Sequence, residues 1–254
     1  MNVINWKDFT DKDYYISSPS AVTVGVFDGM HLGHRFLINR LFTEKSVEKV
    51  VFTFIKNPAW YYHKENYPGD IYTLKQKIDS LKMAGVTTVV LIDFSSDFSK
   101  LTGNYFISCI KKHLNLVKMV SGEDFKCGNN NDTTAADLEE NYFKGTGIYE
   151  MVKRQSFYGF SVSSTAIRDL IRKGNLDQAY EYLEFGHAVD LNIPVIFQDE
   201  NYCYIYKNAV RQVLPDAGRY NMSILLGDKT FKAEVIIDKN IFKWLKTAEQ
   251  QLLL

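Results

Sequence analysis

Two histidines, His31 and His34, stand three residues apart where an apolar run passes through glycines into an amphipathic segment. Residues three apart on a helix face the same side, and imidazole N–H groups can donate to phosphate oxygens whose charge grows during a transfer. A helix start adds backbone N–H groups and the positive end of the helix dipole, and small residues leave room for a nucleotide. The spacing differs from the P-loop, from Gly-x-Gly-x-x-Gly and from the zinc-binding His-Glu-x-x-His. The candidate nucleotide-binding residues are Gly25, Val26, Phe27, Asp28, Gly29, His31, Gly33 and His34.

A second anion site is predicted late in the chain, where hydroxyl residues begin a helical pattern. Ser163, Ser164 and Thr165 stand at the expected helix start, and Gly174 is a stop signal. Arg168 follows one turn later on the side of Thr165, so its guanidinium can bind two phosphate oxygens. The same pattern, taken alone, also fits a well-capped surface helix.

The loop at residues 122–128 follows a predicted strand and combines an acidic with an aromatic residue. An exposed aromatic ring beside a carboxylate can stack on a flat ligand ring and accept its N–H groups. Asp124 and Phe125 are therefore candidates for binding a flat ring, although an ordinary loop has a similar composition.

These motifs depend on the elements that position them. Short apolar, β-branched runs predict buried strands, and segments with helical spacing lie between them. The alternation predicts an α/β fold with a mostly parallel sheet, helices on both faces and a ligand site at the carboxyl ends of the strands. The predicted strands are residues 21–27, 49–54, 87–92, 116–121 and 147–153, and the predicted helical segments are 32–41, 74–81, 106–114 and 135–143.

Helical periodicity ends near Gly186, and short strand patterns follow it. We therefore predict two domains, residues 1–186 and residues 187–254, the second a small β module. Its predicted strands are residues 195–197, 202–206, 220–226 and 231–237, with a tight turn at 226–229 and a short terminal helix.

Composition excludes several classes of protein. With 254 residues, of which 46% are hydrophobic, the chain can bury a sizeable core and is not a disordered protein. Thirty basic residues balance thirty acidic ones, which argues against a nucleic-acid partner. The cysteines Cys109, Cys127 and Cys203 lack paired spacing, which is typical of a reducing compartment. No signal peptide or apolar run of about 20 residues is visible, so we expect a cytoplasmic protein without a membrane partner; the oligomeric state stays open.

The His-x-Gly-His turn resembles the nucleotidyltransferase superfamily, whose histidines bind the triphosphate of ATP or CTP. The wider stretch at residues 22–35 is similar to the FAD synthetase half of the bacterial bifunctional riboflavin kinase/FAD synthetase family, whose pattern is close to Gly-Asn-Phe-Asp-Gly-x-His-x-Gly-His. Val26 replaces the asparagine. The Ser-Ser-Thr-x-Ile-Arg segment at 163–168 resembles a triphosphate-binding loop of this family, with Ala166 where arginine is frequent.

Two weaker segments resemble the same family. Residues 122–128 are similar to its Gly-x-Asp-Phe-Arg-Phe-Gly segment near the flavin, with Lys126 for arginine and Cys127 for phenylalanine. Residues 53–58 match its Thr-Phe-x-Pro-His-Pro only in part, because Lys56 and Asn57 replace proline and histidine. The aromatic residues that follow, Trp60, Tyr61 and Tyr62, are expected in the core or at the rim of a pocket.

The resemblance implies a Rossmann-like nucleotidyltransferase domain with FMN adenylyltransferase activity. Such an enzyme takes ATP, with Mg²⁺, and FMN, and it forms FAD and pyrophosphate without an enzyme nucleophile. His31, His34 and Arg168 would be the catalytic residues that stabilise phosphate charge, and Asp124 and Phe125 would bind the flavin. No protein ligand is assigned to the metal, since magnesium is often bound mainly by substrate oxygens and water.

The second half of that family resembles a β-barrel riboflavin kinase with a phosphate segment reading Gly-x-Pro-Thr-Ala-Asn. Residues 192–197 stand in its place without the threonine and the final asparagine that would bind Mg-ATP. Since the chain ends before a kinase half could close, residues 187–254 are predicted to be a truncated kinase-like partial barrel without kinase activity.

Two alternatives stay open. His-x-Gly-His does not specify the acceptor, so phosphopantetheine or a phosphorylated alcohol could replace FMN. The departures at Val26, Lys56, Asn57, Ala166 and Cys127 also fit a catalytically inactive flavin- or nucleotide-binding regulatory protein.

Overall fold

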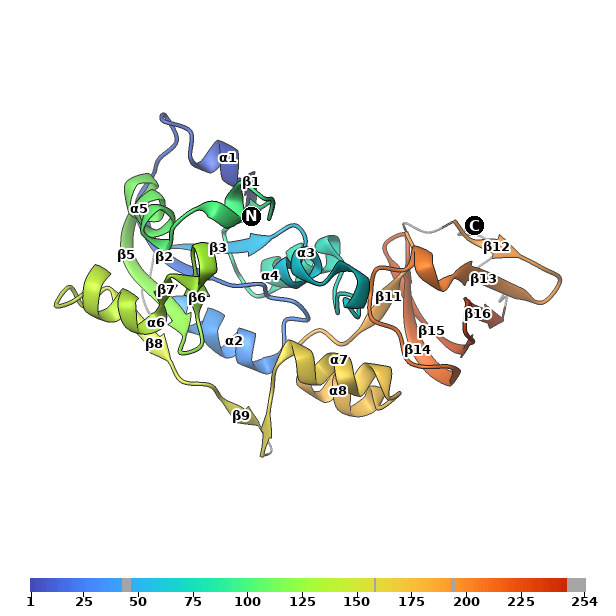
Figure 1. The fold of residues 1–254 in the computed structure, drawn as a ribbon. Helices are drawn as coiled ribbons and strands as arrows, with labels where there is room; N and C mark the ends of the chain where they lie inside the picture. The colour runs from blue at the N-terminus through green and yellow to red at the C-terminus, as the bar shows by residue number, and fades with distance from the viewer. Residues whose placement is uncertain (43–46, 158, 193–194, 246–254) are drawn as a thin grey trace. The chain divides into compact units, whose positions relative to one another are not determined.

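The computed structural model describes residues 1–42, 47–157, 159–192 and 195–245. Contacts divide the chain into two compact units, whose elements are labelled in Figure 1. Unit 1 comprises Met1–Tyr67 and Leu74–Val162, and unit 2 comprises Pro68–Thr73 and Ser163–Leu254. These units differ from the predicted domains 1–186 and 187–254. The helices that follow Val162 pack within unit 2, and so does the segment Pro68–Thr73.

Unit 1 is built on a six-stranded sheet with the order β1-β4-β3-β2-β5-β8, and every neighbouring pair is parallel. The carboxyl ends of parallel strands meet at one edge, and such a sheet needs cover on both faces. The strands are β1 (Asn2–Asn5), β2 (Ile16–Val24), β3 (Glu48–Phe54), β4 (Thr88–Ile92), β5 (Leu114–Gly122) and β8 (Tyr149–Val152).

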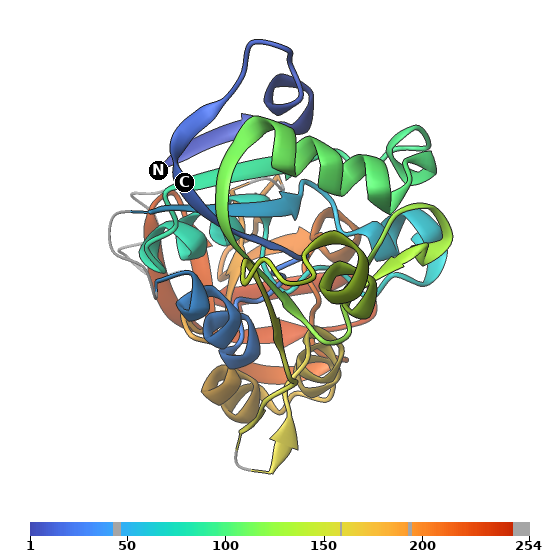
Figure 2. The same cartoon turned by 90° about the vertical axis from the view of Figure 1, so that its left-hand side faces the viewer.

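Helices lie on both faces of this sheet, and Figures 1 and 2 show α5 and α2 on opposite sides. On one face, Val22 and Phe52 belong to a buried core that also contains Phe106 of α5. Among the described residues, none of the helices has the length and apolar character that a membrane crossing requires. The helices are α1 (Trp6–Phe9), α2 (Leu32–Asn39), η1 (Arg40–Phe42), α3 (Pro58–Tyr62), η2 (Lys64–Asn66), α4 (Leu74–Met83), η3 (Phe98–Lys100), α5 (Gly103–His113), η4 (Asn129–Asn131), α6 (Ala135–Asp137) and η5 (Leu138–Tyr142).

Two small hairpins complete unit 1. The strand β6 (Lys126–Cys127) pairs with β7 (Thr133–Thr134), and β9 (Ser156–Phe157) pairs with β10 (Phe160–Ser161). The first hairpin follows β5 directly, so it extends the carboxyl edge of the sheet.

The predicted alternation of strands and helices is confirmed, with differences at several ends. The predicted strand 21–27 ends at Val24, because the residues after it form a turn. The predicted helical segment 106–114 ends at His113, since Leu114 already begins β5. The strand β1 is not predicted from the sequence, because it has only four residues and two apolar side chains.

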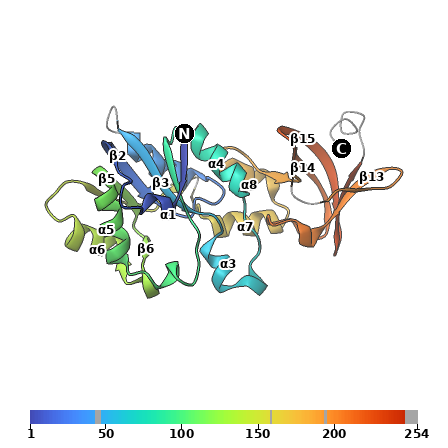
Figure 3. The same cartoon turned by 90° about the horizontal axis from the view of Figure 1, so that it is seen from above.

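Unit 2 combines α7 (Ser164–Arg172) and α8 (Leu176–Tyr182) with a curled six-stranded sheet (Figure 3). All neighbouring strands are antiparallel except β11 and β14. The predicted tight turn is confirmed, since Leu226 pairs with Lys229 and Gly227 has a φ of 61°. The predicted terminal helix lies outside the described residues. In spatial order the strands are β11 (Ala188–Asp190), β14 (Gly218–Leu226), β15 (Lys229–Ile237), β16 (Ile241–Leu245), β13 (Tyr202–Tyr206) and β12 (Phe197–Gln198).

The segment Pro68–Thr73 precedes α4 in the chain but bonds within unit 2. The buried Gln212 side chain donates to Ile71 O at 2.9 Å and to Ala188 O at 3.0 Å, and it accepts from Asp190 N at 2.7 Å. The Thr73 hydroxyl donates to the Asp190 carboxylate at 2.8 Å. Since buried polar groups stabilise a fold only when they are hydrogen-bonded, this network fixes the segment against the β module.

We expect His187 to make unit 2 sensitive to mild acid. Its side chain is buried, both ring nitrogens lack hydrogen-bond partners among the described residues, and burial lowers its pKa from 6.5 to about 4. As the pH falls through this window, the unfolded chain binds a proton that the folded chain excludes. The free energy of unfolding should therefore fall by about 1.4 kcal/mol per pH unit, or about 3 kcal/mol in all.

Denaturant unfolding of the wild type and His187→Phe at pH 7.0 and pH 4.5 checks this expectation. The phenyl ring keeps the stacking on Tyr180 and has no proton to bind. The variant should lose less stability in acid than the wild type, and an equal loss in both proteins would contradict the assignment.

Candidate active site

The turn at residues 25–31 lies where the strand order of unit 1 reverses. The strand β2 pairs with β3 on one side and with β5 on the other, while β4 lies beyond β3. In open α/β sheets the ligand binds outside the carboxyl ends of the strands at such a reversal. The turn leaves the carboxyl end of β2 and leads into α2, so the sheet presents the predicted nucleotide-binding residues where a ligand is expected.

The backbone of this turn is strained. Phe27 and Met30 have φ values of 50° and 34°, in the left-handed region, and Gly29 has a φ of 84°. A residue other than glycine costs about 1 kcal/mol or more in that region. Both side chains are 0% exposed, and the Gly25 N–H donates to Phe52 O at 3.0 Å. Burial and this bond therefore stabilise a shape that the turn would not adopt alone.

His31 caps the helix that the turn leads into. Its backbone is extended, and its Nδ1 accepts a hydrogen bond from the His34 N–H at 3.2 Å. An accepting Nδ1 places the imidazole proton on Nε2, so a neutral His31 can still donate from the other side of the ring. A Cβ on Gly33 would lie 3.2 Å from Nδ1, which explains the glycine at this position.

His34 lies on the same side as His31, as the sequence predicts. The two imidazole rings stack with centroids 3.6 Å apart and planes 15° apart, and the Phe27 ring lies 5.1 Å from His34. No residue in the first turn of α2, which the structure describes in full, is acidic. The positive end of this helix is therefore not neutralised by its own side chains and can attract an anion.

The second predicted anion site is a capped helix start in unit 2. The Ser163 hydroxyl accepts from the Ala166 N–H at 3.2 Å and begins α7, which confirms the predicted helix. Arg168 is buried, and its Nε donates to Gly69 O at 2.9 Å. This arginine thus binds the segment Pro68–Thr73, a contact that sequence spacing does not predict. The histidine turn belongs to unit 1 and this helix to unit 2, and the phosphate-binding role of Ser164, Thr165 and Arg168 stays a prediction.

The predicted flavin loop is fixed by the chain after β8. Arg154 donates to the Asp124 carboxylate at 2.8 Å, and its backbone N–H donates to the Glu123 carboxylate at 2.8 Å. Phe125 is half-buried and packs against the core of unit 1, whereas the sequence analysis assumes an exposed ring. The flavin-binding role of Asp124 and Phe125 stays a prediction, with Asp124 the more accessible of the two.

An aromatic cluster lies at the carboxyl ends of β3 and β4, and of its members only Phe94 was not named from the sequence. Phe54 ends β3, and its ring lies 5.8 Å from that of Phe94, which follows β4. Tyr61 and Tyr62, 40% and 60% exposed, have rings 5.4 Å and 5.6 Å from that of Phe94. The sequence contains a signal for this cluster, because aromatic residues follow two neighbouring strands at the edge of the sheet where ligands bind. This cluster offers planar surface to a flat ligand.

Two departures from the family pattern are explained by local contacts. The Asn57 side chain accepts from the Ala59 N–H at 3.0 Å and so caps α3. The Lys56 ammonium lies 4.6 Å from the centre of the Trp60 ring, a cation–π distance. Neither replacement therefore disrupts the chain after β3.

The Cys127 thiol is not activated, and no metal cage is found among the described residues. Burial, with the carboxylates of Asp132 and Asp137 nearby, raises the pKa of the Cys127 thiol to about 12. A thiol with so high a pKa is not a nucleophile at neutral pH. In the part of the chain that the structure describes, no three His, Cys, Asp or Glu side chains gather as a metal site would require.

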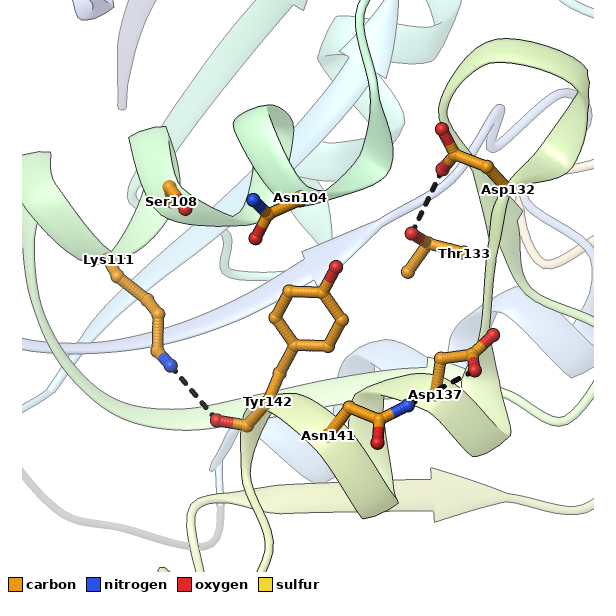
Figure 4. Close-up of a pocket in the computed structure, with 8 residues that line it drawn as sticks. All are labelled: Asn104, Ser108, Lys111, Asp132, Thr133, Asp137, Asn141 and Tyr142. Carbon is orange, nitrogen blue, oxygen red and sulfur yellow. Dashed lines mark hydrogen bonds between the residues drawn. The ribbon is translucent and has the colours of Figure 1, made fainter.

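A separate polar pocket of about 480 Å³ lies between α5 and η5 (Figure 4). Thr133 donates to the Asp132 carboxylate at 3.0 Å and Lys111 donates to Tyr142 O at 2.9 Å, so part of its lining is bonded within the protein. The pocket contains none of the predicted site residues.

A parallel sheet whose reversal point leads into a histidine-capped helix is an arrangement expected of an α/β nucleotidyltransferase. Comparison with known proteins narrows this class. The family model described as FAD synthetase matches residues 14–166. This chain therefore belongs to the FAD synthetase family, and it is a nucleotidyltransferase.

Two relatives agree with this assignment, and a solved structure has a similar fold. The bifunctional riboflavin kinase/FMN adenylyltransferase of Escherichia coli K12 is 29% identical over 224 residues, which cover 82% of this chain and 69% of that protein. The protein of the same name from Bacillus subtilis is 27% identical over 164 residues, covering 63% and 52%. The crystal structure of a macrolide-efflux protein from Streptococcus pneumoniae is similar with a TM-score of 0.78 and 28% identity, covering 96% of this chain and 84% of that one.

Substitutions at His31 can separate helix capping from phosphate binding. Asparagine caps helices well but has no group in the place of the imidazole Nε2–H, whereas alanine has neither. We expect His31→Asn to leave the free energy of unfolding nearly unchanged and to lower the rate of nucleotidyl transfer about a hundredfold. His31→Ala should lose about 1 kcal/mol of stability as well.

Denaturant unfolding and the steady-state release of pyrophosphate check this pair of variants. Transfer at the wild-type rate in His31→Asn would limit His31 to a capping role.

Proposed function

We propose that this protein is an FMN adenylyltransferase that forms FAD and has no riboflavin kinase activity. A phosphate oxygen of FMN attacks the α-phosphorus of ATP, the bond from that phosphorus to the bridging oxygen breaks, and pyrophosphate leaves. Because the acceptor supplies the nucleophile, the enzyme needs to align the two phosphates and stabilise charge rather than form a covalent intermediate.

The observation that carries the proposal is the hydrogen bond that holds the His31 ring at the start of α2. Its Nδ1 accepts from the His34 N–H at 3.2 Å, and in a neutral imidazole with an accepting Nδ1 the proton lies on Nε2, from which it can be donated to a phosphate oxygen. His34 stacks on this ring, and both lie at the helix start. We assign both imidazoles to the triphosphate of ATP, where donors fixed in advance stabilise charge that grows in the transition state.

The rest of the turn fits a nucleotide in the same way. The turn has no side chain at Gly25, Gly29 and Gly33, so a phosphate chain could approach its backbone there. The remaining residues of the turn are Val26, Phe27 and Asp28. In unit 2, Ser163, Ser164, Thr165 and Arg168 are the second set of proposed phosphate ligands. Arg168 also has a structural role, because its Nε donates a hydrogen bond to Gly69 O.

ATP is proposed to enter as its magnesium complex, with the ion as part of the substrate. The described residues contain no cluster of three His, Cys, Asp or Glu side chains that would hold the ion without the substrate. Magnesium commonly keeps water and phosphate oxygens as ligands, so the triphosphate of ATP can supply most of its coordination.

The flavin is proposed to bind at the carboxyl edge of unit 1. The exposed rings of Tyr61 and Tyr62 beside Phe94 supply planar apolar surface for the flavin ring, and Asp124 supplies an acceptor for its N–H groups. A flat aromatic ligand with a phosphate thus suits this edge better than a flexible phosphorylated alcohol.

The absence of kinase activity is proposed from unit 2. In the part of the chain that the structure describes, β11 and β12 are the two edges of an open sheet rather than neighbours in a closed barrel. The sequence has Val195 and Phe197 where a kinase phosphate segment has its threonine and asparagine, and Ile193 and Pro194 lie outside the described residues. Without that segment, riboflavin and ATP lack the alignment that phosphoryl transfer requires.

The cytoplasmic location and the lack of nucleic-acid partners stay predictions.

The reaction itself is the first test. Purified protein with magnesium, ATP and FMN should yield FAD and pyrophosphate in equal amounts on chromatography, whereas riboflavin in place of FMN should yield no FMN. Failure to form FAD while another phosphorylated acceptor is adenylylated would replace the proposed acceptor. Riboflavin phosphorylation at a rate close to that of FAD formation would refute the second half of the proposal.

Asp124 should affect the flavin more than ATP. Since its ion pair with Arg154 is largely exposed, with side chains 66% and 51% accessible, breaking the pair should change stability by less than about 1 kcal/mol. We expect Asp124→Ala to raise the Kd for FMN several-fold, roughly 1 kcal/mol, and to leave the Kd for ATP nearly unchanged.

Arg154→Ala is the matched control, because it breaks the same ion pair and keeps the carboxylate. Calorimetric titration of FMN should show a clearly smaller effect for this control than for Asp124→Ala. Equal losses of affinity would mean that the pair only orders the loop.

A further inference from the structure

The carboxyl end of β3 is bonded to the strained turn by a side chain that has no assigned role. Thr53 is 0% exposed, and its hydroxyl donates to Val26 O at 2.9 Å. The ladder between β2 and β3 ends with the pair of Val24 and Phe52, and the Gly25 N–H still reaches Phe52 O. Beyond Gly25 the backbone ladder has ended, and the Thr53 hydroxyl bond joins β3 to the turn in its place.

The acceptor of this bond lies next to the residue whose backbone is left-handed. Val26 O belongs to the peptide plane that joins Val26 to Phe27, and the φ of 50° at Phe27 is the rotation immediately after that plane. A hydrogen bond to the carbonyl fixes the direction of the whole plane, because the peptide group is rigid. The bond from Thr53 therefore acts where the turn departs from an ordinary backbone shape.

The same bond determines where an amide points. In a trans peptide the N–H and the C=O point in opposite directions, and no peptide in the described residues is cis. With Val26 O directed at Thr53, the Phe27 N–H is directed away from β3. Among the described residues, no backbone carbonyl of the turns and loops accepts a hydrogen bond from this N–H. Its direction therefore follows from the bond at Val26 O, in the turn that leads to the two histidines.

We propose that Thr53 is a positioning residue for nucleotidyl transfer: through its hydroxyl bond to Val26 O, it orients the peptide plane that starts the phosphate-binding turn. The inference rests on the proposed function of that turn. It adds a residue of β3 that would contact neither substrate and would act through the backbone of Val26 and Phe27.

The chain contains a matched control on the neighbouring strand. Thr23 of β2 is also 0% exposed and pairs with Val51 in the ladder, but its hydroxyl has no hydrogen-bond partner among the described residues. Valine has nearly the shape of threonine without the hydroxyl. Thr53→Val therefore removes the bond to the turn, Thr23→Val removes a buried hydroxyl that bonds nothing described, and Thr53→Ser keeps the hydroxyl at position 53.

Steady-state kinetics of FAD formation give the first measurement. In Thr53→Val we expect kcat to fall about tenfold to a hundredfold, because misplaced phosphate contacts affect the transition state most, while the Kd for FMN stays within about twofold. Thr53→Ser should restore most of the activity, and Thr23→Val should behave as the wild type. Wild-type kinetics in Thr53→Val, or equal losses in Thr53→Val and Thr23→Val, would overturn the proposal.

Amide hydrogen exchange gives a second measurement that does not depend on turnover. Peptides that cover residues 25–30 should exchange at least about threefold faster in Thr53→Val than in the wild type, with no such change in Thr23→Val. If the wild type forms no FAD, the proposed function fails, while faster exchange confined to this turn still supports the positioning bond. Unchanged exchange in Thr53→Val overturns the positioning role whatever the activity.

Discussion

Phe27 and Met30 keep a left-handed backbone because the surrounding sheet buries their side chains and binds the chain beside them. This constraint places His31 at the first position before α2, where its ring caps the helix. A relaxed turn would enter the helix at another angle and would separate the imidazoles from the helix start. The position of the proposed phosphate donors thus follows from packing in the interior of unit 1 rather than from contacts among the donors themselves.

The two compact units are not divided simply along the sequence. The segment Pro68–Thr73 interrupts unit 1 and is bonded in unit 2 by Gln212 and by Arg168. Arg168 is therefore part of the structure of unit 2 as well as a candidate phosphate ligand, and a change at this position alters both. Loss of activity on replacing this arginine would not by itself assign it to the nucleotide, in contrast to the histidines, whose Nε2 atoms have no part in capping α2.

The sequence predicts the elements with strong local signals and misses those that depend on tertiary contacts. Hydroxyls at Ser163 and a glycine at 174 locate α7 correctly, because capping is a local property. The end of β2 is predicted three residues too late, since Phe27 is apolar like a strand residue and only its φ of 50° shows that it belongs to a turn. The side of the helix that His31 and His34 share follows from spacing alone. The Arg168 bond to Gly69 joins residues 99 positions apart, and no periodicity reports such a contact. Phe125 shows the same limit, because its type fits a ligand-stacking ring while its neighbours in space place it against the core.

The central claim is that the fixed imidazoles of unit 1 bind the triphosphate, and nitrogen NMR of the histidine rings tests it most directly. In the free protein, the spectrum of ¹⁵N-labelled protein should show His31 with its proton on Nε2 and an accepting Nδ1. Addition of magnesium with a non-hydrolysable ATP analogue should shift the Nε2 resonances of His31 and His34, while FMN alone should leave them nearly unchanged. Resonances that respond to FMN and not to the nucleotide, or a His31 with its proton on Nδ1, would contradict the account.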